Sequence, residues 1–267
     1  MSIDTDLVHI INDMIYEPVG HCIYCGSTMS LQKEHILPLG LSGTAVLPKA
    51  SCSHCARITG QQEQLVLRGP FWPVRVFRSL HSRTKHRDAP SHFPITIERN
   101  HKEEVIELPI EEYPILLHFP IFPPPAFLEP DGYTNGIRVT GVATISFGPS
   151  PEEVGKNYGA TSISLNQSLQ PVAFARVLAK IAYSMAVADN ALARIKGDVP
   201  VLPAILGEKD DIGMWVGTLP DPIKKIEGHL HRVTFHSDIS AGLLIAEVHL
   251  FSDSETPRYG VVIGQLR

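Results

Sequence analysis

The stretch "HCIYCGSTMSLQKEHILPLGLSGTAVLPKASCSHCA", residues 21–56, contains all four cysteines of the 267-residue chain. They form two CxxC pairs, Cys22 with Cys25 and Cys52 with Cys55. Each CxxC turn can direct two thiolates at one ion, so two such turns predict a closed, tetrahedral zinc site. Zinc held by four thiolates has no open position for chemistry. We therefore expect the ion to be structural.

A second feature of this stretch is the dipeptide Glu34-His35, which lies between the two cysteine pairs. Adjacent side chains at a strand end point to opposite sides. A carboxylate can hold a hard divalent cation, and a neutral imidazole can take a proton from water. Together they could hydrolyse a phosphodiester, with the cation stabilising the charge on the phosphate. The alternative interpretation is a surface pair without a function.

The combination "CIYCG…EHILP…SCSHCARITG" resembles the zinc-clipped branch of the HNH endonuclease family, whose ββα-metal motif is a hairpin followed by a helix. The resemblance covers about residues 11–68. It implies that His35 is the general base and that Glu34 is a ligand of a catalytic Mg²⁺ or Mn²⁺. It also implies that the four cysteines hold a structural zinc ion, and that a helix begins near Ser53 and lies with the hairpin against DNA.

Two positions depart from the family's pattern. Family members commonly carry Asn or His directly after the second cysteine pair, where this chain has Ala56, and Asn where it has Leu47. Neither of these side chains can bind a metal. Glu63 lies two helical turns after Ala56 on the same face and is the candidate replacement ligand. The alternative is a catalytically degenerate zinc module that binds nucleic acid without cutting; a purely structural zinc domain is a third reading.

The charge distribution is uneven along the chain, although the formal net charge is only −5. Residues 57–87 contain seven basic residues and one acidic residue, whereas residues 93–267 contain 14 basic and 21 acidic residues. A basic block beside a metal site favours contacts with the phosphates of DNA. We see no base-reading pattern, so we expect little sequence readout. The basic residues are Arg57, Arg68, Arg75, Arg78, Arg83, Lys85 and Arg87.

The chain is predicted to have an α+β fold with two domains. The resemblance implies that residues 1–90 form the HNH-like zinc domain, an N-terminal ββα-metal zinc finger with its basic segment, and we expect residues 91–267 to form a separate α+β region of unknown role, with antiparallel strands and one long helix. Within the first domain we expect an amphipathic helix over residues 5–17 and an extended or loop segment over the proline-rich residues 69–94. Later elements are a hairpin over 94–110, a strand over 136–148, a helix over 168–189 and a meander over 229–266.

The composition, with 43% hydrophobic and 19% charged residues, is that of an ordinary core-forming protein. No apolar run approaches the roughly 18 residues that would span a membrane. The first residues lack the basic and small-residue features of a signal peptide. We therefore predict a cytoplasmic protein with reduced cysteines and no membrane partner. A homodimer is left open.

Overall fold

The computed structural model describes residues 4–10, 14–80, 90–129, 131–220, 225–226 and 228–267. Its helices are α1 (Ser53–Arg68), α2 (Trp72–Phe77), α3 (Pro151–Tyr158), α4 (Pro171–Ala188) and α5 (Leu202–Leu206), with short 3-10 turns η1 (Leu39–Leu41), η2 (Ala126–Leu128), η3 (Ala191–Arg194) and η4 (Ile212–Met214). Its strands are β1 (Asp4–Ile10), β2 (Leu31–His35), β3 (Val46–Cys52), β4 (His92–Arg99), β5 (Lys102–Pro109), β6 (Ile115–Ile121), β7 (Gly141–Phe147), β8 (Ser162–Ser164), β9 (Ile195–Lys196), β10 (Val216–Thr218), β11 (His231–Asp238), β12 (Leu243–Leu250) and β13 (Arg258–Leu266).

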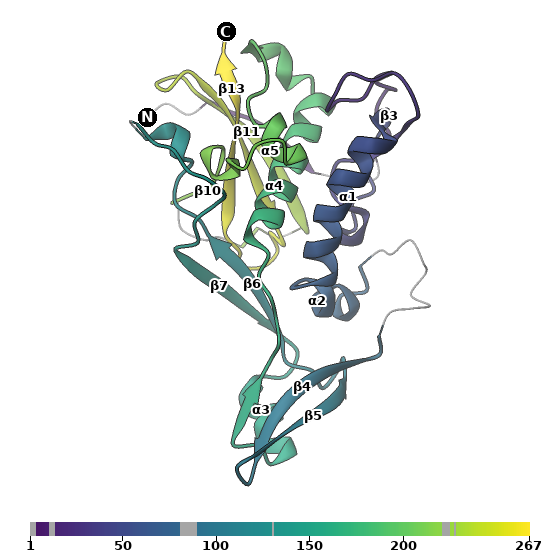
Figure 1. Ribbon diagram of the computed structural model, residues 1–267, viewed down its shortest axis with the longest axis vertical. Helices are drawn as coiled ribbons and strands as arrows, with labels where there is room; N and C mark the ends of the chain where they lie inside the picture. Colours follow the sequence, from purple (N-terminus) through teal and green to yellow (C-terminus); the bar gives the residue numbers. More distant parts are fainter. Residues whose placement is uncertain (1–3, 11–13, 81–89, 130, 221–224, 227) are drawn as a thin grey trace.

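The largest sheet is antiparallel and has the order β1-β11-β12-β13-β10, with β9 added beside β13. The predicted meander is confirmed, because β11, β12 and β13 pair consecutively. Helix α4 packs against β12 and β13, and α1 packs against α4 (Figure 1). The core runs through the contact between α4 and the sheet, where Leu178 and Ile181 are as fully buried as Val248 and Val261.

Helix α4 is the predicted long helix, and Pro171 lies in its first turn as expected. Its side chains are apolar around most of its circumference, which is typical of a helix enclosed on several sides. By length and composition it could cross a membrane, but 72% of it is buried inside the protein. Burial of this extent is typical of a helix in a protein core.

The zinc region is a small antiparallel pair, β2 with β3, followed at once by α1. Glu34 lies opposite Leu47, and His35 lies opposite Val46. Helix α1 begins at Ser53, where the resemblance placed it, and Cys52 caps it. The structure therefore has the order hairpin, then helix, while membership of the HNH family stays a prediction.

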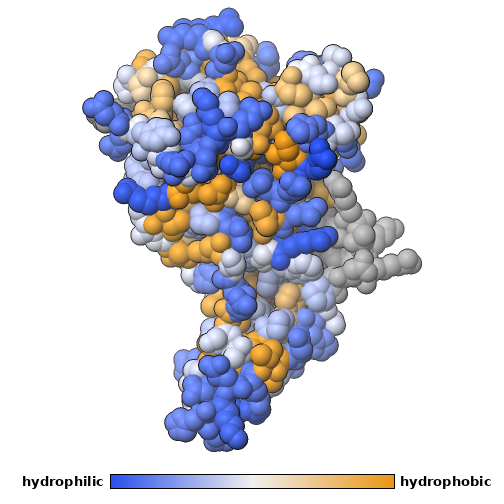
Figure 2. Space-filling model, viewed as in Figure 1, coloured by the Kyte–Doolittle hydropathy of each residue, from blue (hydrophilic) through white to orange (hydrophobic). Residues whose placement is uncertain are grey.

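A narrow extension leaves the main body at the end opposite the C-terminus (Figure 1). It contains the three-stranded sheet β5-β4-β8 and α3, and the β6–β7 ribbon lies between it and the main sheet. Pairing of β4 with β5 confirms the predicted hairpin. Much of the extension's surface in this view is hydrophilic (Figure 2).

Two predicted elements are wrong. Residues 4–10 form strand β1, not a helix, because they pair antiparallel with β11 and complete an edge of the main sheet. Trp72–Phe77 form helix α2, not a loop, since Pro73 falls in the first turn, where proline is tolerated. The domain boundary near residue 90 stays a prediction, but residues from both of its sides share the main sheet.

Candidate functional site

The four cysteines converge at the junction of β3, α1 and the preceding CxxC turn. Their sulfur atoms all lie within 4.8 Å of one another, and the Sγ atoms of Cys25 and Cys52 are 3.7 Å apart. All four are free thiols, and three of them are buried. Four sulfur donors in such a cluster match the ligand set of a structural zinc ion, so the cluster could hold zinc.

The local backbone explains why the sulfur atoms meet. In the first pair, Gly26 adopts a φ of +73° and its N–H donates to the Cys22 carbonyl, which closes the turn. In the second pair, the backbone N–H of Cys55 donates to the Cys52 sulfur at the start of α1. This hydrogen bond lowers the pKa of the Cys52 thiol to about 7, which favours the thiolate that binds metal.

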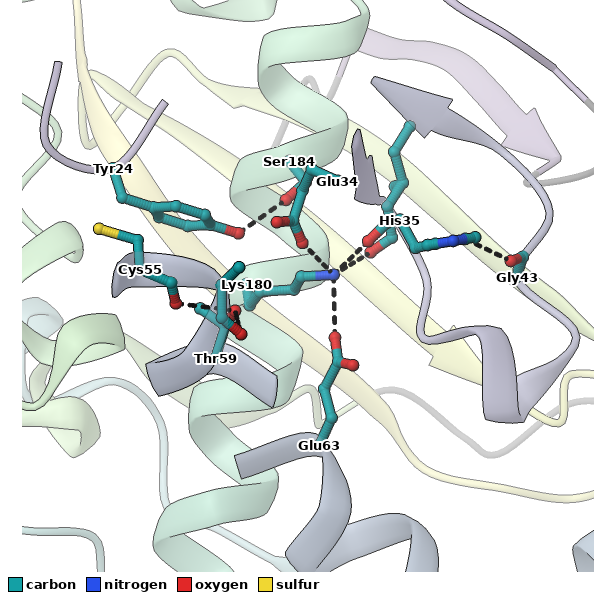
Figure 3. A network of polar contacts seen from close by, with 11 residues as sticks. Tyr24, Glu34, His35, Gly43, Cys55, Thr59, Glu63, Lys180 and Ser184 are labelled. Carbon is teal, nitrogen blue, oxygen red and sulfur yellow. Dashed lines mark hydrogen bonds and ion pairs between the residues drawn. The ribbon is translucent and has the colours of Figure 1, made fainter. Parts of the chain in front are cut away.

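Beside the zinc cluster, Glu34 makes a buried ion pair with Lys180 of α4. The Lys180 Nζ lies 2.7 Å from Glu34 Oε1 and 3.0 Å from Glu63 Oε1 (Figure 3). It also donates to the backbone carbonyls of His35 and Ile36. The ammonium thus has four oxygen partners although its side chain is only 2% exposed.

The charge state of this group follows from its neighbours. Burial by itself would lower the pKa of Lys180, but the coulombic attraction of Glu34 and Glu63 outweighs burial and the net pKa is raised. Lys180 is therefore a cation at neutral pH. Glu63 and Glu34 do converge on one cation, and that cation is a side chain of the protein.

His35 points away from this ion pair. Its Nδ1 lies 3.1 Å from the Gly43 carbonyl (Figure 3). Because a carbonyl can only accept, we assign the ring proton to Nδ1, which leaves Nε2 with a lone pair. Burial is the largest cause that lowers the pKa of His35 below its usual value, and the positive charges of Lys33 and Lys180 add to it. The imidazole is therefore neutral at pH 7.

His35 lines a surface cavity of about 670 Å³ between η1 and α1. Ala56 also lines it, so the position where the family carries a metal ligand contributes only a methyl group. Leu47 is buried, 2% exposed, in the core. Glu63 is at the cavity wall and is the carboxylate nearest in sequence to the missing ligand.

The residues of the predicted basic block have different roles in the structure. Arg75 donates to the carbonyls of Gly40 and Leu67, and so ties α2 to η1 and α1. Arg78 forms an ion pair with Asp253, with nitrogen–oxygen distances of 2.5 and 3.1 Å. Arg57 and Arg68 are exposed and line the His35 cavity. Arg83, Lys85 and Arg87 lie outside the described residues.

Lys180 is the site residue that the sequence did not reveal. It lies 145 residues after His35, within a run of apolar and small residues that predicts a core helix. The available signal was a single lysine in a buried helix, because a buried lysine needs a carboxylate partner. The pattern could not specify which of the chain's carboxylates it would meet.

Comparisons with family models, with curated proteins and with solved structures found no match for this chain.

Proposed function

We propose that this protein binds the phosphate backbone of a nucleic acid at the His35 cavity, and that it does not hydrolyse the backbone through a metal ion on Glu34. The observation that carries the proposal is the Lys180 ammonium between Glu34 and Glu63. It pairs with the two carboxylates that could otherwise share a catalytic cation. The zinc ion would have only a folding role, in a cytoplasmic protein with reduced thiols.

Electrostatics support this proposal over metal-dependent cleavage. A divalent cation about 4 Å from the ammonium would be repelled by it by about 8 kcal/mol at an effective dielectric constant of about 20, which offsets much of the attraction of the two carboxylates. Its binding would require Lys180 to leave, and that side chain is enclosed between α1 and α4. Glu34 is also buried, 5% exposed, so water and substrate reach it poorly.

The cavity itself has the groups that a phosphate needs. Arg57 and Arg68 supply guanidinium donors. Gln61 and Gln64 add amide groups on the same helix. These contacts recognise a charged backbone and contain no base-reading geometry, so binding should depend strongly on salt and weakly on sequence.

Binding and cleavage of DNA can be measured in the same sample. A fluorescently labelled DNA strand is mixed with the zinc-loaded protein and Mg²⁺; polarisation reports binding, and a denaturing gel of the same sample reports cleavage. We expect binding that weakens with salt, and intact DNA. Arg57→Gln should weaken binding, whereas Arg99→Gln on the distant β4 should leave it unchanged. Cleaved DNA, or no binding at low salt, would contradict the proposal.

A second candidate function is the metal-dependent HNH-type endonuclease. The arrangement of His35 favours it, because a neutral imidazole anchored through Nδ1 presents Nε2 as a general base at a cavity wall. Glu63 would then be the main protein ligand of Mg²⁺ or Mn²⁺. If the protein is such an endonuclease, His35→Ala should abolish cleavage by the purified protein and leave its zinc content unchanged.

A further inference from the structure

A second cleft, of about 580 Å³, lies next to the His35 cavity, between α2, β4 and the chain that precedes α4. Aromatic and aliphatic side chains make up much of its lining: Trp72, Phe93, Val105 and Tyr113, with prolines 73, 90 and 94. Arg68 lines both this cleft and the His35 cavity. An apolar recess and a cationic cavity therefore share one arginine.

We propose that this cleft receives an unstacked base of a single-stranded nucleic acid whose phosphate lies in the His35 cavity. The inference rests on the proposed function and assigns its substrate class. A base has a flat apolar face, and its phosphate is negatively charged. A site that binds both therefore combines an aromatic surface with a nearby cation. The shared Arg68 places that cation between the two cavities.

The side chains of the cleft suit a base. Trp72 is half-buried, and its ring has the Arg68 guanidinium 5.9 Å from its centroid. Phe93 and Tyr113 are buried and pack against each other with tilted rings at a centroid distance of 5.3 Å, which gives the cleft an aromatic floor. Val105 is 66% exposed at the edge, so the cleft is open to a ligand.

The remaining edge of the cleft is polar. Asn166, Gln167 and Ser168 line it from the segment before α4. Their amide and hydroxyl groups provide both donors and acceptors, which is what the edge of a base requires. Stacking tolerates every base, so we expect binding of single strands with little preference for sequence.

The experiment compares a labelled oligothymidylate with an abasic strand of the same length and charge, using polarisation and the full zinc-loaded protein. The wild type should bind the oligothymidylate about tenfold more tightly, the loss typical of one missing stacked base. Val105→Trp fills the mouth of the cleft without a change in charge, and should reduce that difference to less than twofold.

Val142→Trp is the matched control, because Val142 is also exposed (45%) but lies on β7, outside the cleft. It should keep the tenfold difference. Equal binding of both strands by the wild type would overturn the base site and leave the phosphate-binding proposal standing. Failure of both strands to bind would overturn both, and an unchanged preference in Val105→Trp would place the base elsewhere.

Discussion

At the residue scale, the pairing of Lys180 with two glutamates determines which cation those glutamates can bind. Glu34 and Glu63 alone would be a plausible pair of metal ligands. With the Lys180 Nζ at 2.7 and 3.0 Å they form a triad around a buried ammonium, and the triad carries one net negative charge. The same carboxylates therefore stabilise a contact between α1, β2 and α4.

Removing the cation should be costly. Lys180→Met leaves the buried Glu34 and the half-buried Glu63 side by side without their cation, and we expect a loss of about 3–5 kcal/mol in the free energy of unfolding. Urea denaturation measures it. Lys156→Met is the control, because Lys156 forms an exposed pair with Glu152 and should cost less than about 0.5 kcal/mol. Similar losses in the two variants would contradict the triad.

The protonation of His35 gives a second prediction. Its pKa in the folded state is lowered, mainly by burial. The unfolded chain therefore binds the proton more readily, so stability is full above a pH of about 6.5 and decreases as the pH falls towards the folded pKa. An NMR titration of the His35 ring, assigned with His35→Gln, should give a midpoint below 6.5. A midpoint above 6.5 would show that the ring is solvated or paired with an acid.

At the element scale, the sequence predicts some pieces well. The hairpin β4–β5, helix α4 and the meander β11–β13 follow from apolar periodicity, which each of these elements satisfies by itself. Strand β1 was missed because its partner, β11, lies more than 220 residues away, and tertiary pairing overrode a helical pattern. Helix α2 was missed because Pro70, Pro73, Pro90 and Pro94 suggested a loop, although Pro73 suits a helix start.

The four-cysteine cluster brings the first CxxC turn to the start of α1, so a zinc ion held there would join these two elements. We expect one zinc ion per chain by elemental analysis of protein purified under reducing conditions. Cys55→Ser should lower the zinc content well below one and destabilise the hairpin and α1. Ser53→Ala, a neighbouring change that removes no sulfur, should keep the zinc. A wild-type protein without stoichiometric zinc would refute this zinc site.

At the scale of the whole molecule, the zinc region is bound to the rest by side chains of α4. Besides Lys180, Tyr183 donates to the Ile23 carbonyl at 2.5 Å, and the Tyr24 hydroxyl lies 3.4 Å from that of Ser184. Ile23 and Tyr24 belong to the first CxxC turn. The sequence could not predict these contacts, because no local pattern indicates that α4 packs against a turn some 160 residues earlier.

This connection predicts that the molecule unfolds as one unit. In a Trp72→Phe background, Trp215 is the only tryptophan and reports on the C-terminal region. Its fluorescence change in urea should coincide with zinc release, because the buried core is continuous from Cys22 to Ile263. Zinc release at clearly lower urea than the fluorescence change would instead indicate an independent zinc domain.

The central claim is that the Lys180 ammonium occupies the place a catalytic cation would need. The most direct measurement is Mn²⁺ binding to the zinc-loaded wild type, followed by electron paramagnetic resonance and compared with Glu34→Gln. We expect that the wild type binds no Mn²⁺ tightly through Glu34, so the wild type and Glu34→Gln should give the same binding curve. A tightly held Mn²⁺ in the wild type that Glu34→Gln abolishes would contradict it.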